Sequence, residues 1–140
     1  MRKLYVLCVL VAVTMLHTGC FLLSTSTSDS TPSKPTVDYA PQMMRHGSYL
    51  SFTRPDGEAI KIVFESHNVA ELPECSASNG RINAAYYRYD GFNMASLTYN
   101  YQPNGGMSKQ YKAELNFSYE TGGTIRFLES DQTARFTYRP

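Results

Sequence analysis

A strict alternation of apolar and polar residues, which recurs from about residue 46 to the C-terminus, constrains the fold more than any other feature. In the segment 111–119, every second residue is apolar and the residues between are Lys, Glu, Asn and Ser. Successive side chains of a β-strand point to opposite faces, so this pattern is typical of a strand with one buried and one wet face. The same alternation predicts strands near residues 50–52, 60–64, 85–89, 95–101, 111–119, 125–127 and 134–138.

Turn residues separate these predicted strands. Residues 54–57 (Arg-Pro-Asp-Gly) suit a type I turn, and residues 90–91 (Asp-Gly) suit a two-residue hairpin turn. Residues 103–106 and the pair Gly122 and Gly123 break the next two links. Short links imply antiparallel neighbours, and a long meander must close to hide its apolar face and its edges. We therefore predict an all-β fold: an antiparallel meander of roughly seven strands, closed into a small barrel or sandwich.

The N-terminus has the layout of a secretory signal. A positive pair at residues 2–3 precedes an apolar run at residues 4–16, which is short for a membrane span. Residues 18–20 (Thr-Gly-Cys) resemble the lipobox of bacterial lipoproteins, although His17 stands where that family usually has Leu. The resemblance implies a signal peptide over residues 1–19, removed before a Cys20 that carries lipid (palmitate or similar acyl chains). Two alternatives are an uncleaved spanning helix at residues 4–23 and ordinary cleavage that releases a soluble protein.

Residues 20–45 are predicted to be the lipidated Cys20 and a disordered linker rich in Ser, Thr and Pro, followed by a β domain at residues 46–140. Such a composition buries too little apolar surface to order the chain, and it suits a tether that holds a domain off a membrane. The residue after Cys20 is Phe21 rather than Asp, which by resemblance to lipoprotein sorting implies the outer membrane. The only long connection within the domain, residues 66–80, is the candidate functional loop.

The middle third of the chain resembles a small β domain that recurs in secreted proteins and lipoproteins of Verrucomicrobia-type bacteria. The resemblance rests on four short segments, at residues 87–89 (Tyr-Arg-Tyr), 93–97 (Asn-Met-Ala-Ser-Leu), 115–117 (Leu-Asn-Phe) and 123–124 (Gly-Thr). That family commonly has a longer first turn than residues 90–92. It implies a calycin-like layout and brings no assigned activity.

Motifs that carry chemistry are missing from the sequence. His46, His67 and Cys75 lack the spacing of a zinc site, and no nucleophile elbow or phosphate-binding loop occurs. If Cys20 is acylated, Cys75 is the remaining cysteine of the mature chain, either buried or open to an intermolecular disulfide. The net charge is +1, about −1 without the signal, and no basic run predicts nucleic-acid binding. We expect no catalysis, no cofactor and no bound metal.

Tyrosine is the one compositional oddity, with eleven Tyr and seven Phe but no Trp. The tyrosines of three successive predicted strands either pack in the core or line a groove or barrel mouth. In the second interpretation the candidate ligand-facing residues are Tyr87, Tyr89, Tyr99, Tyr101 and Tyr111. The sequence thus predicts a lipid-anchored module of the cell envelope that binds an envelope protein, a glycan or a small apolar ligand. The alternative is a structural or assembly component of an envelope complex.

Overall fold

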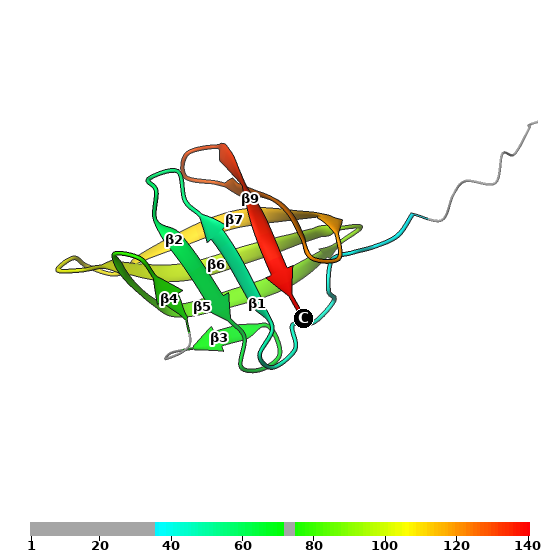
Figure 1. The fold of residues 1–140 in the computed structure, drawn as a ribbon, viewed down its shortest axis with the longest axis horizontal. Helices are drawn as coiled ribbons and strands as arrows, with labels where there is room; N and C mark the ends of the chain where they lie inside the picture. The colour runs from blue at the N-terminus through cyan, green and yellow to red at the C-terminus, as the bar shows by residue number, and fades with distance from the viewer. Residues whose placement is uncertain (1–35, 72–74) are drawn as a thin grey trace, which may run out of the picture. The chain divides into compact units, whose positions relative to one another are not determined.

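The computed structural model describes residues 36–71 and 75–140, of which Val37–Pro140 form one packed unit. The predicted signal peptide, Cys20 and the linker up to residue 35 lie outside the described residues. The described chain contains nine strands and no helix (Figure 1). The strands are β1 Tyr49–Thr53, β2 Ala59–Val63, β3 Val69–Glu71, β4 Ser76–Ala77, β5 Gly80–Gly91, β6 Met94–Pro103, β7 Lys109–Tyr119, β8 Gly122–Phe127 and β9 Gln132–Arg139. No described helix could therefore cross a bilayer.

The strands form a closed antiparallel barrel. The chain runs as a meander from β5 to β9, and β9 pairs with β1, for example Tyr138 opposite Leu50. From β1 the sheet continues through β2 and β4 to β5, which also pairs with β6 and so closes eight strands. The ninth strand, β3, pairs with β5 outside this ring. The prediction of an all-β antiparallel meander is confirmed, and the closure is that of a barrel.

All seven predicted strands are present, and the two additional ones lie within the connection 66–80. β3 and β4 have three and two residues, too few for an alternation to be recognised in the sequence. The hairpin between β5 and β6 also differs from the prediction. Its turn residues are Phe92 and Asn93, both with positive φ, and not residues 90–91. The expected hairpin is there, but its turn lies two residues further along the chain.

Side chains from all parts of the ring fill the interior of the barrel. Phe117 packs edge-to-face on Phe136, with ring centroids 4.9 Å apart, and Phe52 packs in the same way on Tyr99 at 5.7 Å. The largest fully buried side chains are those of Tyr99, Phe64, Phe117, Phe136, Met44, Leu50, Ile60, Ile62, Ile82, Leu97, Leu115 and Ile125. An eight-stranded barrel is narrow enough for side chains to fill. Binding is therefore to be looked for at the ends and on the outer face.

Residues 37–46, which we call the strap, close one end of the barrel. Ala40 and Met44 are buried in the core, and Met44 donates its backbone N–H to the Asn68 side chain at 2.6 Å. The packed unit therefore begins at Val37, whereas the sequence placed the domain boundary at His46. Residues 40–44 (Ala-Pro-Gln-Met-Met) show no alternation of apolar and polar residues, so the sequence pattern could not distinguish the strap from the linker.

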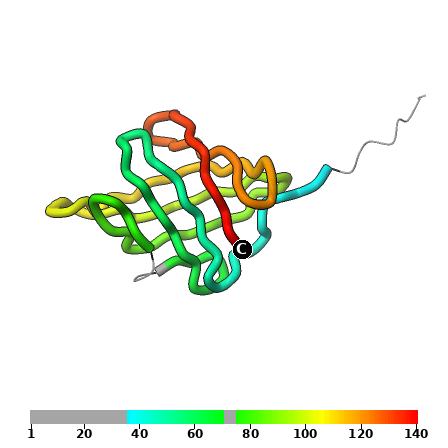
Figure 2. The backbone as a smooth tube through the Cα atoms, in the orientation of Figure 1, coloured from blue at the N-terminus to red at the C-terminus, as the bar shows by residue number. Residues whose placement is uncertain are grey.

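The two ends of the barrel differ in what covers them (Figure 2). In an up-and-down barrel alternate turns lie at opposite ends. The β1–β2, β4–β5, β6–β7 and β8–β9 turns form one end, which we call the Arg54 end after the residue at the start of the β1–β2 turn. The β5–β6 and β7–β8 turns lie at the other end together with the strap, and we call this the strap end.

Candidate functional site

A buried arginine lies at the Arg54 end of the barrel. The predicted type I turn is present: Gly57 donates its N–H to the Arg54 carbonyl at 2.9 Å, and the Arg54 N–H reaches the Glu58 carbonyl at 2.8 Å. This turn directs the Arg54 side chain over the barrel mouth. Its guanidinium carbon lies 3.9 Å from the ring centroid of Tyr111 and 4.9 Å from that of Tyr101. Only 10% of the Arg54 side chain is exposed, so these cation–π contacts are largely shielded from water.

The Arg54 guanidinium is a permanent cation with one carboxylate partner. Its Nη2 lies 3.1 Å from Oδ2 of the largely exposed Asp56. Burial alone would lower the pKa of Arg54, but the Tyr111 hydroxyl and the charge of Asp56 act in the other direction, and the pKa is raised. The site therefore keeps its positive charge at every pH at which the protein folds.

Two buried polar atoms at this place, one of them on the guanidinium itself, have no hydrogen-bond partner. Across the described residues, Arg54 Nη1 and the Tyr99 hydroxyl are the only buried side-chain nitrogen or oxygen atoms in this condition. Tyr99 is 1% exposed, and its ring stacks on that of Tyr111 at 5.6 Å. Burial raises the pKa of Tyr99, although the Arg54 charge acts the other way, so the hydroxyl keeps its proton. Each unpartnered group lowers the free energy of unfolding by roughly 1–3 kcal/mol. Two such groups at one place call for a functional explanation.

A surface pocket of about 190 Å³ opens directly at Arg54. It is lined by Arg54, Pro55, Asp56, Tyr111, Phe127, Glu129 and Ser130. The pocket therefore combines an aromatic floor with a cation and two carboxylates. Glu129 also fixes the β8–β9 turn, because its Oε1 accepts the Lys112 backbone N–H at 2.8 Å.

A second carboxylate contact holds the β1–β2 turn from the opposite side. Glu58 is 5% exposed and accepts hydrogen bonds from the Asn79 backbone N–H at 2.6 Å and from Asn79 Nδ2 at 3.0 Å. Burial alone would raise the pKa of Glu58, but the two bonds from Asn79 lower it, so the carboxylate stays ionised. The β1–β2 turn is thus tied to the β4–β5 turn, which fixes the base of Arg54 before any ligand arrives.

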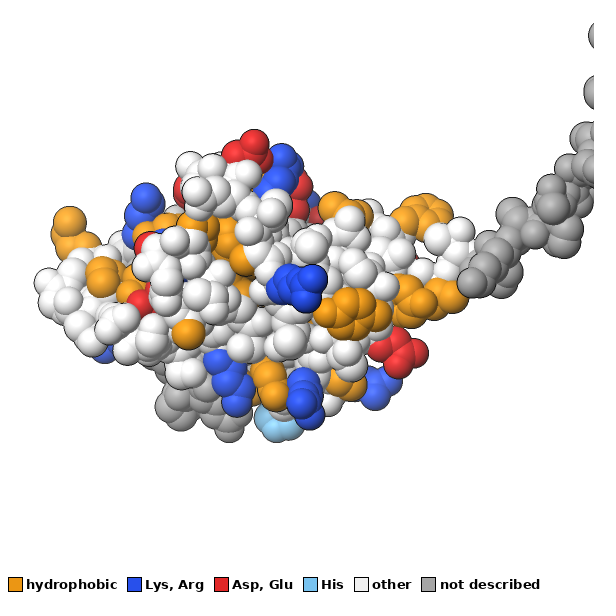
Figure 3. Space-filling model, turned by 45° about the horizontal axis from the view of Figure 1, so that its top comes forward, with side chains coloured by type: hydrophobic (Ala, Val, Ile, Leu, Met, Phe, Trp, Pro, Cys, Tyr) orange, Lys and Arg blue, Asp and Glu red, His pale blue; other side chains and the backbone are white. Residues whose placement is uncertain are grey.

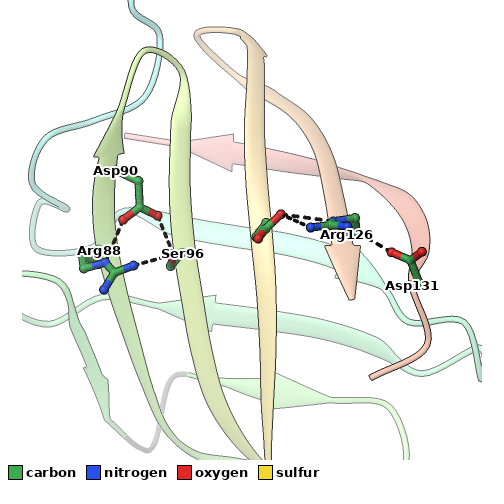
Figure 4. Close-up of polar contacts among 6 residues, drawn as sticks. Arg88, Asp90, Ser96, Arg126 and Asp131 are labelled. Carbon is green, nitrogen blue, oxygen red and sulfur yellow. Dashed lines mark hydrogen bonds and ion pairs between the residues drawn. The ribbon is translucent and has the colours of Figure 1, made fainter. Parts of the chain in front are cut away.

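The outer face of β5–β8 carries polar groups that are already paired (Figure 4). Asp90 accepts from Arg88 at 2.7 Å and from Ser96, and Arg126 bonds Asp131 at 3.1 Å and Glu114 at 2.6 Å. A groove of about 390 Å³ runs along this face. Exposed ion pairs of this kind contribute little stability each but favour one strand register. The ion pairs of this face are explained by strand pairing, and we take the Arg54 pocket, beside the two unpartnered atoms, as the candidate site.

The structure divides the five tyrosines that the sequence singled out. Tyr99, Tyr101 and Tyr111 gather at the Arg54 end around the guanidinium. Tyr87 and Tyr89 reach the strap, where the Tyr87 hydroxyl donates to the Pro41 carbonyl at 2.6 Å and the Tyr89 hydroxyl donates to Asp38. The first group lies around Arg54, with Tyr111 alone of the five lining the pocket, and the second serves to hold the strap.

Sequence reasoning missed Arg54, which it treated as an ordinary turn residue. A long cation directly before Pro in a tight turn is common on protein surfaces, and only the stagger of the strands places this one over an aromatic mouth. The sequence feature that could have predicted the role of Arg54 is the alternation of tyrosines on β6 and β7, because aromatic residues on paired strands form a platform for a cation.

The two histidines share one surface hollow, and Cys75 is buried. His46 and His67 line one hollow of about 580 Å³ with Glu65, and His46 Nδ1 bonds the Glu65 carbonyl at 2.6 Å. Over residues 36–71 and 75–140, no group of three or more His, Cys, Asp or Glu is arranged to hold a metal ion. Cys75 is buried, with its Sγ 3.4 Å from the Val63 N and 3.5 Å from the Val63 O. Of the two fates expected for Cys75, the structure has the buried one.

These features define a class: an eight-stranded antiparallel barrel with a filled interior and a mixed aromatic and charged pocket at one end. Comparison of the chain with known protein families, with curated proteins and with solved structures finds no match. The assignment of a function therefore depends on the chemistry of the pocket.

Proposed function

We propose that this protein is a lipid-anchored binding module of the cell envelope, without catalysis, which holds a neutral, hydroxyl-rich ligand such as a glycan at the Arg54 pocket. The observation that carries this proposal is the pair of buried, unpartnered polar atoms, Arg54 Nη1 and the Tyr99 hydroxyl. Such a cost calls for a specific explanation, and in this proposal a ligand that shifts the Arg54 side chain on binding supplies the missing hydrogen bonds. The filled barrel interior supports binding at the pocket rather than in the lumen.

The charges around Arg54 favour a neutral ligand over an anion. Asp56 and Glu129 line the pocket, and the ionised Glu58 lies on the same turn. An anion would be attracted by one cation and repelled by three carboxylates. Sugar hydroxyls, in contrast, accept from a guanidinium and donate to carboxylates, while the apolar face of a sugar ring packs on aromatic side chains such as Phe127.

The test is a calorimetric titration of the mature protein with a panel of neutral oligosaccharides derived from bacterial envelopes. We expect binding to the wild-type protein, and a loss of about tenfold or more in affinity for Arg54→Gln, since hydrogen bonds to charged groups contribute about 1.5–3 kcal/mol each. Arg54→Lys should restore the charge but little of the affinity, because Lys lacks the planar fork. Arg88→Gln, on the outer face, is the matched control and should bind as the wild type does.

Two outcomes contradict the proposal. Unchanged glycan affinity in Arg54→Gln would remove the pocket from the binding site, and a flat response across the whole panel would remove the ligand class. The proposed absence of catalysis is checked in the same titrations, because turnover would alter the oligosaccharides recovered afterwards.

The anchor is tested separately at Cys20. The mature protein should lack residues 1–19, partition into detergent and carry the mass of its acyl chains, because two or more chains anchor stably where one does not. Cys20→Ser should release the domain or leave an uncleaved precursor. A Cys20→Ser protein that is still processed at the same bond and still membrane-bound would contradict the anchor. Fractionation should find the wild type in the outer membrane, as the resemblance at Phe21 implies.

The alternative function is a structural or assembly component of an envelope complex. The filled interior of the barrel is the observation that favours it, since a packed barrel can serve as a rigid support. Affinity purification from membranes separates the two. Recovery of a stoichiometric partner from a protein that binds no glycan would support the structural role.

A further inference from the structure

Exposed large hydrophobic side chains are concentrated at the strap end. Seven such residues occur in the described chain: Val37, Met43, Tyr86, Phe92, Met107, Tyr119 and Leu128. Four of them lie on elements of the strap end, namely Val37 and Met43 on the strap, Phe92 in the β5–β6 turn and Tyr119 at the end of β7. Figure 3 shows hydrophobic side chains beside the point where the described chain begins. The Arg54 end has two, at Met107 and Leu128.

Phe92 is the most unusual of these residues. Its φ is 43°, in the left-handed region that bulky residues avoid, and 82% of it is exposed. Packing gives no reason for an aromatic residue at this place, since the ring contributes little to the core. Strained positions of this kind are concentrated at functional sites, where the surrounding structure holds them.

The turn that carries Phe92 is held firmly by its neighbour Asn93. The Asn93 N–H donates to Asp38 Oδ1 at 2.9 Å, and Asn93 Nδ2 donates to the Val37 carbonyl at 3.2 Å. On the other side, the Phe117 N–H donates to the Asn93 carbonyl at 2.8 Å. The strap, the β5–β6 turn and β7 are thus fixed to one another. Phe92 is presented to the surroundings from a rigid base.

The chain that leads to the proposed lipid enters the domain at this same end. Val37 is the first residue of the packed unit, and sixteen residues separate it from Cys20 in the sequence. Even a fully extended chain of that length reaches only about 55 Å. In a protein acylated at Cys20, the strap end is therefore tied directly to the anchor and held within that distance of the bilayer. Trp and Tyr are enriched at membrane–water interfaces, where the ring lies at the level of the headgroups, and Phe is common on the apolar face of segments that lie in this interface.

We infer that the strap end docks on the lipid surface, with Phe92 inserted among the headgroups and Val37, Met43 and Tyr119 around it. This inference rests on the proposed anchor at Cys20 and adds an orientation to it. Docking at the strap end turns the Arg54 pocket, at the other end of the barrel, away from the membrane and toward the ligand.

The absence of Trp from the sequence makes a direct test possible. Phe92→Trp and, as the matched control, Met107→Trp each introduce a single fluorophore at a highly exposed position, one at each end; Met107 is 89% exposed. The full acylated proteins are reconstituted in phosphatidylcholine vesicles whose acyl chains are brominated just below the headgroups. Circular dichroism confirms that both variants fold. We expect a blue shift and bromine quenching in Phe92→Trp, and the emission of a water-exposed indole in Met107→Trp.

Flotation of the vesicles distinguishes a failure of the proposed anchor from a failure of the proposed docking. A protein that does not float with the vesicles overturns the anchor and the docking together. A protein that floats, but whose Phe92→Trp emission is unquenched, overturns the docking and leaves the anchor intact. Equal quenching in both variants means that the barrel lies on its side, which also overturns the docking.

Discussion

Removal of a single hydroxyl at Tyr99 should stabilise the protein and at the same time weaken its binding. The Tyr99 hydroxyl is buried and has no hydrogen-bond partner, so Tyr99→Phe removes a desolvated polar group and no contact. Tyr87→Phe is the matched control. It makes the same chemical change at another buried ring, but there the hydroxyl donates to the Pro41 carbonyl at 2.6 Å. The two variants should therefore change stability in opposite directions.

The magnitudes follow from the cost of burying polar groups. An unsatisfied hydroxyl costs about 1–3 kcal/mol, and since the ring and its packing remain, Tyr99→Phe should raise the free energy of unfolding by about 1 kcal/mol. Tyr87→Phe should lower it by about 1–1.5 kcal/mol, because one bond is lost and the Pro41 carbonyl loses its donor. For a domain of this size, 1 kcal/mol corresponds to roughly 4–8 °C in melting temperature.

Urea denaturation, followed by circular dichroism at neutral pH, measures both variants on the same scale as the wild type. The free energies should be compared at equal m-values, so that a change in the denatured state is not mistaken for a change in the folded one. A loss of more than 1 kcal/mol in Tyr99→Phe would refute the reasoning, since it would mean that the hydroxyl has a partner in the free protein. Glycan affinity that is unchanged in Tyr99→Phe would refute its role in the pocket.

Four further predictions follow from the same contacts. Burial raises the pKa of Tyr87 and Tyr99 in the folded state, so the unfolded chain loses these protons first, near pH 10. The contribution of these two groups to stability should be constant below that pH and fall above it, which urea titrations with tyrosinate absorbance can follow. Phe92→Asn should stabilise the free domain by about 1 kcal/mol by relieving left-handed strain, yet reduce vesicle docking. Gly123→Ala should cost about 3 kcal/mol or more, because the new Cβ would lie 1.9 Å from a backbone oxygen of β7, and calorimetry should show the loss. Cys75→Ser should cost about 1–2 kcal/mol in urea while membrane attachment stays unchanged.

The sequence predicted strands wherever the alternation was long enough to be distinctive. β7, with eleven residues, and β6, with ten, carry the pattern clearly. β3 and β4 exist because β5 and β2 offer them hydrogen-bonding edges, and a contact of that kind leaves no trace in a segment of two or three residues. Tertiary pairing, not local propensity, makes these two strands.

The position of the β5–β6 turn was missed for a related reason. Asp90 and Gly91 are the usual residues of a two-residue hairpin turn, but Asp90 instead bonds Arg88 and Ser96 on the outer face. The turn moves on to Phe92 and Asn93, where hydrogen bonds to the strap fix it. Those bonds join residues more than fifty positions apart, so no local rule for turns can include them.

Alternation predicts which side chains face inward, but not how deep they lie along the barrel. That depth depends on the tilt and stagger of the strands, which closure of the ring determines. Tyr87, Tyr99 and Tyr101 all face inward, yet Tyr87 meets the strap while Tyr101 meets Arg54 at the other end. The tyrosines could thus be recognised as a group from the sequence, whereas the pocket that Tyr111 lines with Arg54 could not.

Two of the departures from ordinary folding rules in the described chain have the same physical character. At one end, Arg54 and Tyr99 hold buried polar atoms without partners; at the other, Phe92 holds a bulky ring in a left-handed turn, exposed to water. Each lowers the stability of the isolated domain, and each is offset in our proposals by an outside contact: ligand hydroxyl groups that pair the buried atoms in the first case, and lipid headgroups that remove the exposed ring from water in the second. Local conflicts that persist in an otherwise consistent fold are expected at functional positions. Because they lie at opposite ends of the barrel, the proposed module can dock on a membrane at the strap end and bind a ligand at the Arg54 end.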